Sequence, residues 1–331
     1  MFSIIAKFFK IILLKNAIII FKFLIIRKNM TRFALIINQQ SGKSNKDQLV
    51  ETIKTFLIEK NIAEKDILTF YPKSADETRE MAKETCLDKV DIIIPLGGDG
   101  TIKLVCAGIY EGGGHARLGL IPTGTVNNLA KSLGVPLNTK KALENLFSGQ
   151  ELAIDMAKVS NQYMISSLTL GLMADMALSV TPENKRRFGA LAFIKAGWKI
   201  FLRRRSYRVQ AISDQKKQYI KTKLLLVTMS NTVAGLPGFN RKDTVDDGLF
   251  TVYTLKKTHF IRFFFYFFFR IGKFSQFKHW DSFQASELRL VNVRQKDKNN
   301  PNVRIDGDVA GKLPVLIQML PKAITVIVPK K

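Results

Sequence analysis

Residues 91–101 read DIIIPLGGDGT, an apolar run that passes directly into a glycine-rich turn. The run predicts a buried strand, and the residues after the turn predict a helix over Ile102–Ile109. Glycines let the backbone approach a ligand closely, and Thr101 is expected to cap the helix. The charge of Asp99 repels phosphate, so we expect this residue to act through Mg²⁺ or to hydrogen-bond other groups of the site. Because the turn is not GxGxxG, a Rossmann dinucleotide site is excluded.

Three further segments repeat this order of strand, turn and helix. Residues 33–37 precede a polar turn and a predicted helix near 47–59, and residues 67–70 precede a predicted helix over 75–86. Residues 118–130, LGLIPTGTVNNLA, combine a strand, a Gly/Thr turn and the start of a helix. Such units predict a parallel sheet whose turns gather at its carboxyl edge, where open α/β sheets bind ligands.

Composition limits the classes of function. Of 331 residues, 52 are Lys or Arg and 27 are Asp or Glu, which gives a net charge of +25. This charge favours a polyanionic partner, either nucleic acid or an anionic membrane leaflet. The two cysteines form no CxxC pair and only three histidines occur, which argues against a zinc site, a disulfide framework and a His-based triad. Residues 42–44, GKS, are not part of a P-loop, because Ile37 stands where that motif needs a glycine.

The glycine-rich turns resemble signature motifs of diacylglycerol kinase catalytic domains. Residues 97–101 are similar to that family's GGDGT loop, residues 122–130 to its P-x-G-T-x-N-D-x-A motif, and residues 38–42 to its opening N-P-x-S-G turn. NAD kinases share GGDGT, so this loop alone identifies only the superfamily. The resemblance implies ATP and Mg²⁺ as cofactors. It implies the following nucleotide-binding residues: Asn38, Ser41, Gly42, Gly97, Gly98, Asp99, Gly100, Thr101, Gly124, Thr125 and Asn127.

Two motifs in the second half of the chain extend this resemblance. Residues 244–249, TVDDGL, are similar to a D-D-G-L element of bacterial lipid kinases. This similarity implies a Mg²⁺ site made by the carboxylate of Asp247 with Thr244 and Leu249; the alternative is an ordinary Asp-Gly turn. Residues 306–308, Asp-Gly-Asp, resemble the family's D-G-E motif, which supplies the base that faces the lipid hydroxyl. On an extended strand Asp306 and Asp308 would face the same side, although Gly307 between them permits a bend. We expect Asp306 to be the base and Asp308 to orient it or to contact a basic group.

Four positions depart from the family's pattern. Lys103 and Leu104 stand where the family has Asn-Glu after GGDGT, Asn128 replaces an aspartate, and Asp308 replaces a glutamate. Each change near the expected Mg²⁺–ATP site removes or shortens a carboxylate, or adds a cation. A weakened or differently tuned enzyme is therefore an alternative, and Lys103 could itself neutralise phosphate.

Three apolar, basic segments suggest contact with a membrane. Residues 1–29 place their lysines within one arc of a helix, which fits a helix in the membrane interface; a signal anchor, or an upstream extension before a start at Met30, are the alternatives. Residues 258–274 are rich in Phe and residues 185–208 are rich in Arg and Lys. They fit contacts with acyl chains and headgroups, or a core helix and a solvated basic face. We expect a cytoplasmic protein, peripheral at the inner face of the membrane.

Together these patterns predict an α/β protein with two domains. An open parallel-sheet nucleotide domain covers residues 31–152, a β-rich lipid domain covers residues 153–331, and the active site lies in the cleft between them. The expected function is an ATP-dependent lipid kinase that converts diacylglycerol to phosphatidate. A sphingoid base or undecaprenol as acceptor, or a catalytically weakened membrane- or nucleotide-binding module, are the alternatives. Nucleic acid is not an expected partner, because only the net charge suggests it, and a homodimer is left open.

Overall fold

The computed structural model describes residues 31–39, 46–171, 206–232, 244–255, 280–293 and 300–330. The segments 1–29 and 258–274, all but the last residues of 185–208, and Ser41 and Gly42 lie outside the described residues. None of the described helices is long and apolar enough to cross a membrane.

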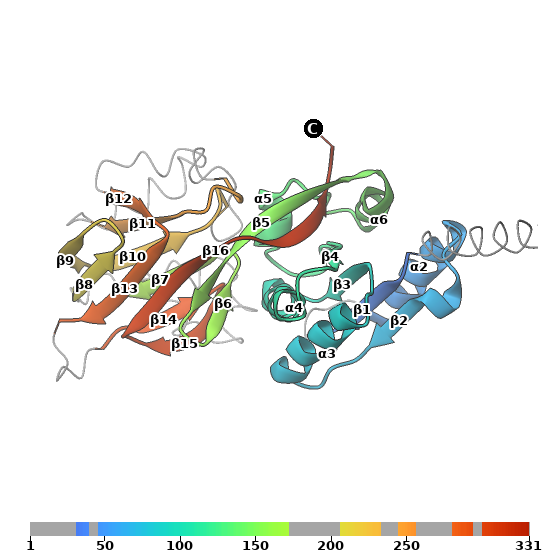
Figure 1. Ribbon diagram of the computed structural model, residues 1–331, viewed down its shortest axis with the longest axis horizontal. Coiled ribbons are helices and arrows are strands. Elements are labelled where there is room, and N and C mark those ends of the chain that lie inside the picture. Colours follow the sequence, from blue (N-terminus) through green and yellow to red (C-terminus); the bar gives the residue numbers. More distant parts are fainter. Residues whose placement is uncertain are drawn as a thin grey trace, which may run out of the picture.

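The first part of the chain forms a parallel sheet in the order β2-β1-β3-β4 (Figure 1). Its strands are β1 (Phe33–Ile37), β2 (Ile67–Phe70), β3 (Ile92–Leu96) and the short β4 (Arg117–Leu118). All residues of β1 and β3 are buried, because helices cover both faces of the sheet. The predicted parallel sheet is confirmed.

Four helices cover this sheet, and the short α5 (Asn128–Ser132) follows the second glycine turn. Helices α3 (Ala75–Leu87) and α4 (Asp99–Glu111) contribute to one apolar cluster, and α2 (Lys46–Glu59) and α6 (Thr139–Ser148) to a second. Helices α3 and α4 lie very close together, since a Cβ at Gly108 would be 2.3 Å from the carbonyl oxygen of Arg79. This close contact fixes the position of α4, which carries the GGDGT turn at its start.

The second part is a sandwich of two sheets. One is antiparallel, in the order β12-β11-β10-β7-β14-β15, and the other continues the first sheet through β16, β13, β8 and β9. Their bounds are β7 (Ser167–Gly171), β8 (Tyr207–Ser213), β9 (Lys217–Thr222), β10 (Leu224–Thr228), β11 (Phe250–Leu255), β12 (Trp280–Ala285), β13 (Glu287–Asn292), β14 (Asn302–Ile305), β15 (Asp308–Lys312) and β16 (Val315–Val328). Aliphatic side chains from both sheets form a separate core between them. The expected β-rich second part is confirmed.

Long strands join the two parts (Figure 1). Strand β5 (Gln150–Val159) pairs with β16 along its length, and the short β6 (Gln162–Met164) pairs with β5. Near its end β16 pairs in parallel with β4, through Val326 and Leu118, so the last strand of the chain completes the first sheet. The proposed boundary at 152/153 thus falls inside β5, and the range 153–331 contains this returning strand.

Candidate active site

The GGDGT turn links β3 to α4. Gly98 is the N-cap, and the helical hydrogen bonds begin with Ile102 N–H donating to the Gly98 carbonyl at 3.1 Å. The prediction that Thr101 caps this helix is therefore wrong, because extended backbone ends at Gly98 and Thr101 already lies in the first turn. Its Oγ1 accepts a hydrogen bond from Asn38 Nδ2 at 3.1 Å, which ties the β1 turn to α4. A Cβ at Gly97 would lie 2.2 Å from this Oγ1, whereas a Cβ at Gly98 would meet only Gly124 Cα at 4.0 Å.

The second glycine turn packs against the first. Gly124 N–H donates to Asn127 Oδ1 at 2.9 Å, and Asn127 Nδ2 donates to the Gly124 carbonyl, also at 2.9 Å. Asn127 has φ of 55°, a left-handed conformation that asparagine tolerates. Thr123 Oγ1 donates to the Gly97 carbonyl at 2.8 Å. Thr125 is exposed at the tip of this turn, so its side chain points away from the protein core.

Asp99 connects the two turns. Its Oδ1 accepts a hydrogen bond from Asn128 N–H at 2.8 Å, where α5 begins. Burial raises the pKa of the Asp99 carboxyl, and the backbone N–H groups of residues 127–129 oppose this by stabilising the anion. We expected Asp99 either to act through Mg²⁺ or to hydrogen-bond other groups of the site, and in the structure it forms such a hydrogen bond.

Asp306 is buried beneath the β14–β15 turn. Its Oδ1 accepts hydrogen bonds from the N–H groups of Ser166 and Ser167 at 2.9 and 2.8 Å, and its Oδ2 from Ile165 N–H at 3.0 Å. Burial outweighs these bonds and raises the pKa of Asp306 to about 6. Asp306 and Gly307 have φ of 50° and 92°, so the chain reverses here and is not extended. Of the two geometries expected, the structure therefore has the bend that Gly307 permits, and Asp306 and Asp308 do not share one side of an extended strand.

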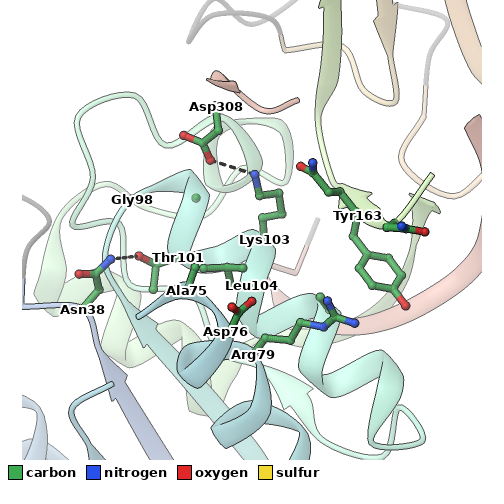
Figure 2. Close-up of a pocket in the computed structure, with 14 residues that line it drawn as sticks. Asn38, Ala75, Asp76, Arg79, Gly98, Thr101, Lys103, Leu104, Tyr163 and Asp308 are labelled. Atoms are coloured by element: carbon green, nitrogen blue, oxygen red, sulfur yellow. Dashed lines mark hydrogen bonds and ion pairs between the residues drawn. The ribbon is translucent and has the colours of Figure 1, made fainter. Parts of the chain in front are cut away.

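Asp308 projects from the other arm of this turn (Figure 2). Its side chain is 61% exposed, and its Oδ2 is 2.9 Å from Lys103 Nζ on α4, whose side chain is only 10% exposed. The same oxygen would lie 3.1 Å from a Cβ at Gly100. The second part of the chain thus places a carboxylate directly against the first turn of α4.

A cavity of about 520 Å³, a size typical of small-molecule sites, lies between the two parts of the chain, and Asp308 and Lys103 are in its lining. Several of the predicted site residues are not among the residues that line it: Gly97, Asp99, Gly124, Thr125, Asn127 and Asp306. Its walls come from the start of α3, the inner face of α4, the β5–β6 turn and Asp308. Asn38, Gly98, Gly100 and Thr101, all predicted from the sequence, take part in the lining.

A cluster at the opposite end of the cavity was missed by reasoning from the sequence. Arg79 on α3 donates two hydrogen bonds to Glu111 at the end of α4, one of them from Nε at 2.7 Å. Tyr163 on β6 donates to the same carboxylate at 2.9 Å, and its ring centroid lies 5.5 Å from the Arg79 guanidinium. Arg79 lowers the pKa of Glu111, while burial raises the pKa of Tyr163 to about 12. No motif marks these residues, because they meet only when β6 docks on the helices.

The predicted metal ligands lie in a separate turn and are not among the residues that line the cavity. Asp247 Oδ1 accepts a hydrogen bond from Leu249 N–H at 3.0 Å, and Thr244 and Asp247 are exposed. Buried Asp155 holds this turn, because its Oδ2 accepts from Gly248 N–H at 2.7 Å. No cluster of three or more His, Cys, Asp or Glu side chains that could hold a metal occurs among the described residues.

Comparison with known proteins identifies relatives over most of the chain. The family profile described as diacylglycerol kinase catalytic domain matches residues 32–159. The chain is 30% identical to the diacylglycerol kinase of Bacillus subtilis strain 168 over 310 residues, which is 91% of this chain and 98% of that protein. It is 23% identical to the diacylglycerol kinase of Staphylococcus aureus strain RF122 over 302 residues, 90% of this chain and 92% of that protein. A crystal structure of a diacylglycerol kinase from Bacillus anthracis strain Sterne has the same fold, with a TM-score of 0.68, 19% identity, and coverage of 91% of this chain and 97% of that one.

Proposed function

The chain belongs to the diacylglycerol kinase family and is a lipid kinase, and from this premise we propose that it transfers the γ-phosphate of ATP to diacylglycerol, which yields phosphatidate. One observation carries the proposal. The glycine turn at the start of α4 and the exposed carboxylate of Asp308 meet at one cavity, although they come from the two different parts of the chain.

The nucleotide phosphates would bind at the start of α4. The N–H groups of a helix N-terminus and its dipole attract anions, and the open space beside Gly98 lets a phosphate approach the backbone. The turn at Gly124 and Thr125 would form a second wall, shaped by the paired hydrogen bonds between Gly124 and Asn127. Asn38 would complete the nucleotide site, and Ser41 and Gly42, which follow it closely in the sequence, remain proposed contacts.

We assign the general base to Asp308. Its carboxylate faces the cavity, whereas both oxygens of Asp306 already accept backbone N–H groups. The proposal therefore exchanges the roles expected from the sequence, and Asp306 positions the turn that presents Asp308. In the reaction, the lipid oxygen forms a bond to the γ-phosphorus, the bond from that phosphorus to the bridging oxygen breaks, and the electron pair leaves with ADP. The proton of the lipid hydroxyl passes to Asp308.

We propose two places for Mg²⁺, one on the bound nucleotide and one in the separate turn that contains Asp247. A kinase of this type binds ATP with Mg²⁺, which neutralises charge on the phosphates. A carboxylate with backbone carbonyls and water is also a set of ligands that Mg²⁺ accepts, so Asp247, Thr244 and Leu249 remain our proposed protein-held site. Asp155 would support it, because it fixes Gly248 within the same turn.

A lipid substrate places the enzyme at a membrane surface. We propose that the protein is cytoplasmic and binds the inner leaflet peripherally, where its net charge of +25 favours anionic lipids. Sphingoid bases and undecaprenol remain the competing acceptors, since the shape of the lipid pocket decides between them.

An acceptor screen with γ-labelled ATP tests this function. Purified full-length protein is assayed with diacylglycerol, a sphingoid base and undecaprenol in mixed micelles, alongside Asp308→Asn and the control Asp88→Asn, an exposed aspartate at the far end of α3. We expect labelled phosphatidate from the wild type and the control, and almost none from Asp308→Asn. Preferential labelling of another lipid would change the substrate, and ATP binding without any labelled lipid would show a nucleotide-binding module.

A further inference from the structure

We propose that Lys103 is a catalytic residue that grips the γ-phosphate of bound ATP while it holds Asp308 in place. The inference rests on the proposed function, because it concerns the same cavity. It adds a group that the resembled motif lacks, since that motif has Asn where this chain has Lys103.

The position of the ammonium group supports this role. Lys103 is the fifth residue of α4, and its nearly buried side chain ends at the cavity, where the ammonium reaches Asp308 (Figure 2). Asp308 Oδ2 lies 2.9 Å from this ammonium, and a Cβ at Gly100 would lie 3.1 Å from the same oxygen. The cation therefore lies beside the first helical turn, where we place the phosphates.

The partners of the two cations in the described lining differ. Arg79 is bound by both oxygens of Glu111, and Tyr163 donates to one of them, so this group is held in a structural cluster. Lys103 is paired with Asp308, whose side chain is largely exposed and can share its partner with an entering phosphate. Of these two cations, Lys103 is thus the one suited to a triphosphate.

Two of the other three departures from the motif act in the same direction. Leu104 and Asn128 stand where the motif has carboxylates, so negative charge is removed from the site while Lys103 adds positive charge. A site of this kind attracts ATP even when little Mg²⁺ neutralises the phosphates. In the transfer step the Lys103 ammonium neutralises the phosphoryl oxygens, while Asp308 accepts the proton of the lipid hydroxyl.

Nucleotide binding gives a test that does not depend on turnover. Equilibrium dialysis of ATP and ADP, with and without Mg²⁺, is compared for the full-length wild type, Lys103→Met, Lys103→Arg and the control Lys54→Met, a lysine on α2 that pairs with Glu51 at 3.7 Å. A charged hydrogen bond corresponds to roughly a 10–100-fold change in affinity. We expect Lys103→Met to weaken the binding of ATP by this factor, most strongly without Mg²⁺, and to weaken the binding of ADP by less than about threefold. Lys103→Arg should keep part of the preference for ATP over ADP, and the control Lys54→Met should keep all of it.

The Asp308→Asn background separates contact with phosphate from an effect through Asp308. If Lys103 touches the γ-phosphate, Lys103→Met still reduces the preference for ATP over ADP in that background. If Lys103 acts only through Asp308, or if ATP and ADP lose affinity equally in Lys103→Met, the inference is overturned. If the wild type binds ATP more tightly than ADP, Lys103→Met loses this difference, and the wild type labels no lipid, the contact of Lys103 with phosphate would be supported and the proposed lipid phosphorylation would be overturned. Lipid phosphorylation with an unchanged preference in Lys103→Met would overturn this inference alone.

Discussion

Substitution of Asp306 and Asp308 by Asn should separate stability from catalysis. The Asp306 carboxylate accepts three backbone N–H groups from residues 165–167, at 2.8 to 3.0 Å. An Asn side chain keeps only one acceptor oxygen, so at least one of these buried N–H groups would face an NH₂ group. A buried donor left without an acceptor lowers the free energy of unfolding by about 1–3 kcal/mol, and removal of the buried charge, whose burial raises the pKa of Asp306, offsets part of this loss. We therefore expect Asp306→Asn to be about 1–2 kcal/mol less stable than the wild type at pH 7.

Asp308→Asn should show the opposite behaviour. Its side chain is 61% exposed and its described ion-pair partner is Lys103, so the free energy of unfolding should change by less than about 0.5 kcal/mol. Removal of a general base lowers turnover by about 10²–10⁴-fold. Asp306→Asn should keep measurable turnover at temperatures where it remains folded, since its role is to hold the turn.

Two measurements on the same preparations decide the matter. Urea unfolding followed by circular dichroism gives the stability of both variants, and the labelled-lipid assay gives turnover at a temperature below both transitions. The Asp88→Asn control should match the wild type in each. If Asp306→Asn is as stable as the wild type but inactive, while Asp308→Asn is active, Asp306 reaches the lipid hydroxyl and our assignment of the base is refuted.

Three further predictions follow from contacts outside this pair. Gly108→Val should lower the free energy of unfolding by about 1–3 kcal/mol or more, since the new Cβ would meet the α3 backbone at 2.3 Å; urea unfolding that matches the wild type would contradict this close packing. Tyr163→Phe removes the hydroxyl that donates to Glu111 at 2.9 Å, so the free energy of unfolding should fall by about 0.5–1.5 kcal/mol. The KM for lipid should rise, because β6 is held less firmly. An unchanged KM would show that this cluster contributes to stability alone. Burial raises the pKa of Asp306 from 3.8 to about 6, so between these values the folded protein binds a proton there that the unfolded chain does not. The contribution of Asp306 to stability should therefore grow as the pH falls from about 6 to about 4, by at most about 1.4 kcal/mol per pH unit, and the gap in unfolding free energy between wild type and Asp306→Asn should be wider at pH 5 than at pH 7.

The sequence alone determined the local elements of the nucleotide-binding part. The strands Phe33–Ile37 and Ile67–Phe70 end where they were predicted, because apolar runs bounded by polar or glycine-rich turns specify buried strands through neighbouring residues only. The need for glycine at position 97 is also local, because a Cβ there would meet Thr101 Oγ1 at 2.2 Å, whereas at Gly124 a Cβ would also meet Gly98 Cα of the other turn at 2.8 Å, a contact that only the tertiary structure creates. The boundary of α4 was missed, because Gly98 and Asp99 are compatible with either a loop or a helix start.

Only the tertiary structure decided which side chains act together. Lys103 and Asp308 are 205 residues apart in the chain, and Asp306 finds its partners about 140 residues away, in the turn that follows β6. Residue spacing along a strand suggested equal orientations for Asp306 and Asp308, but the left-handed turn at Asp306 turns one carboxylate into the core and the other toward the cavity. Such orientations depend on how the sandwich docks against α4, and contacts between distant segments leave no periodic pattern in the sequence from which they could be predicted.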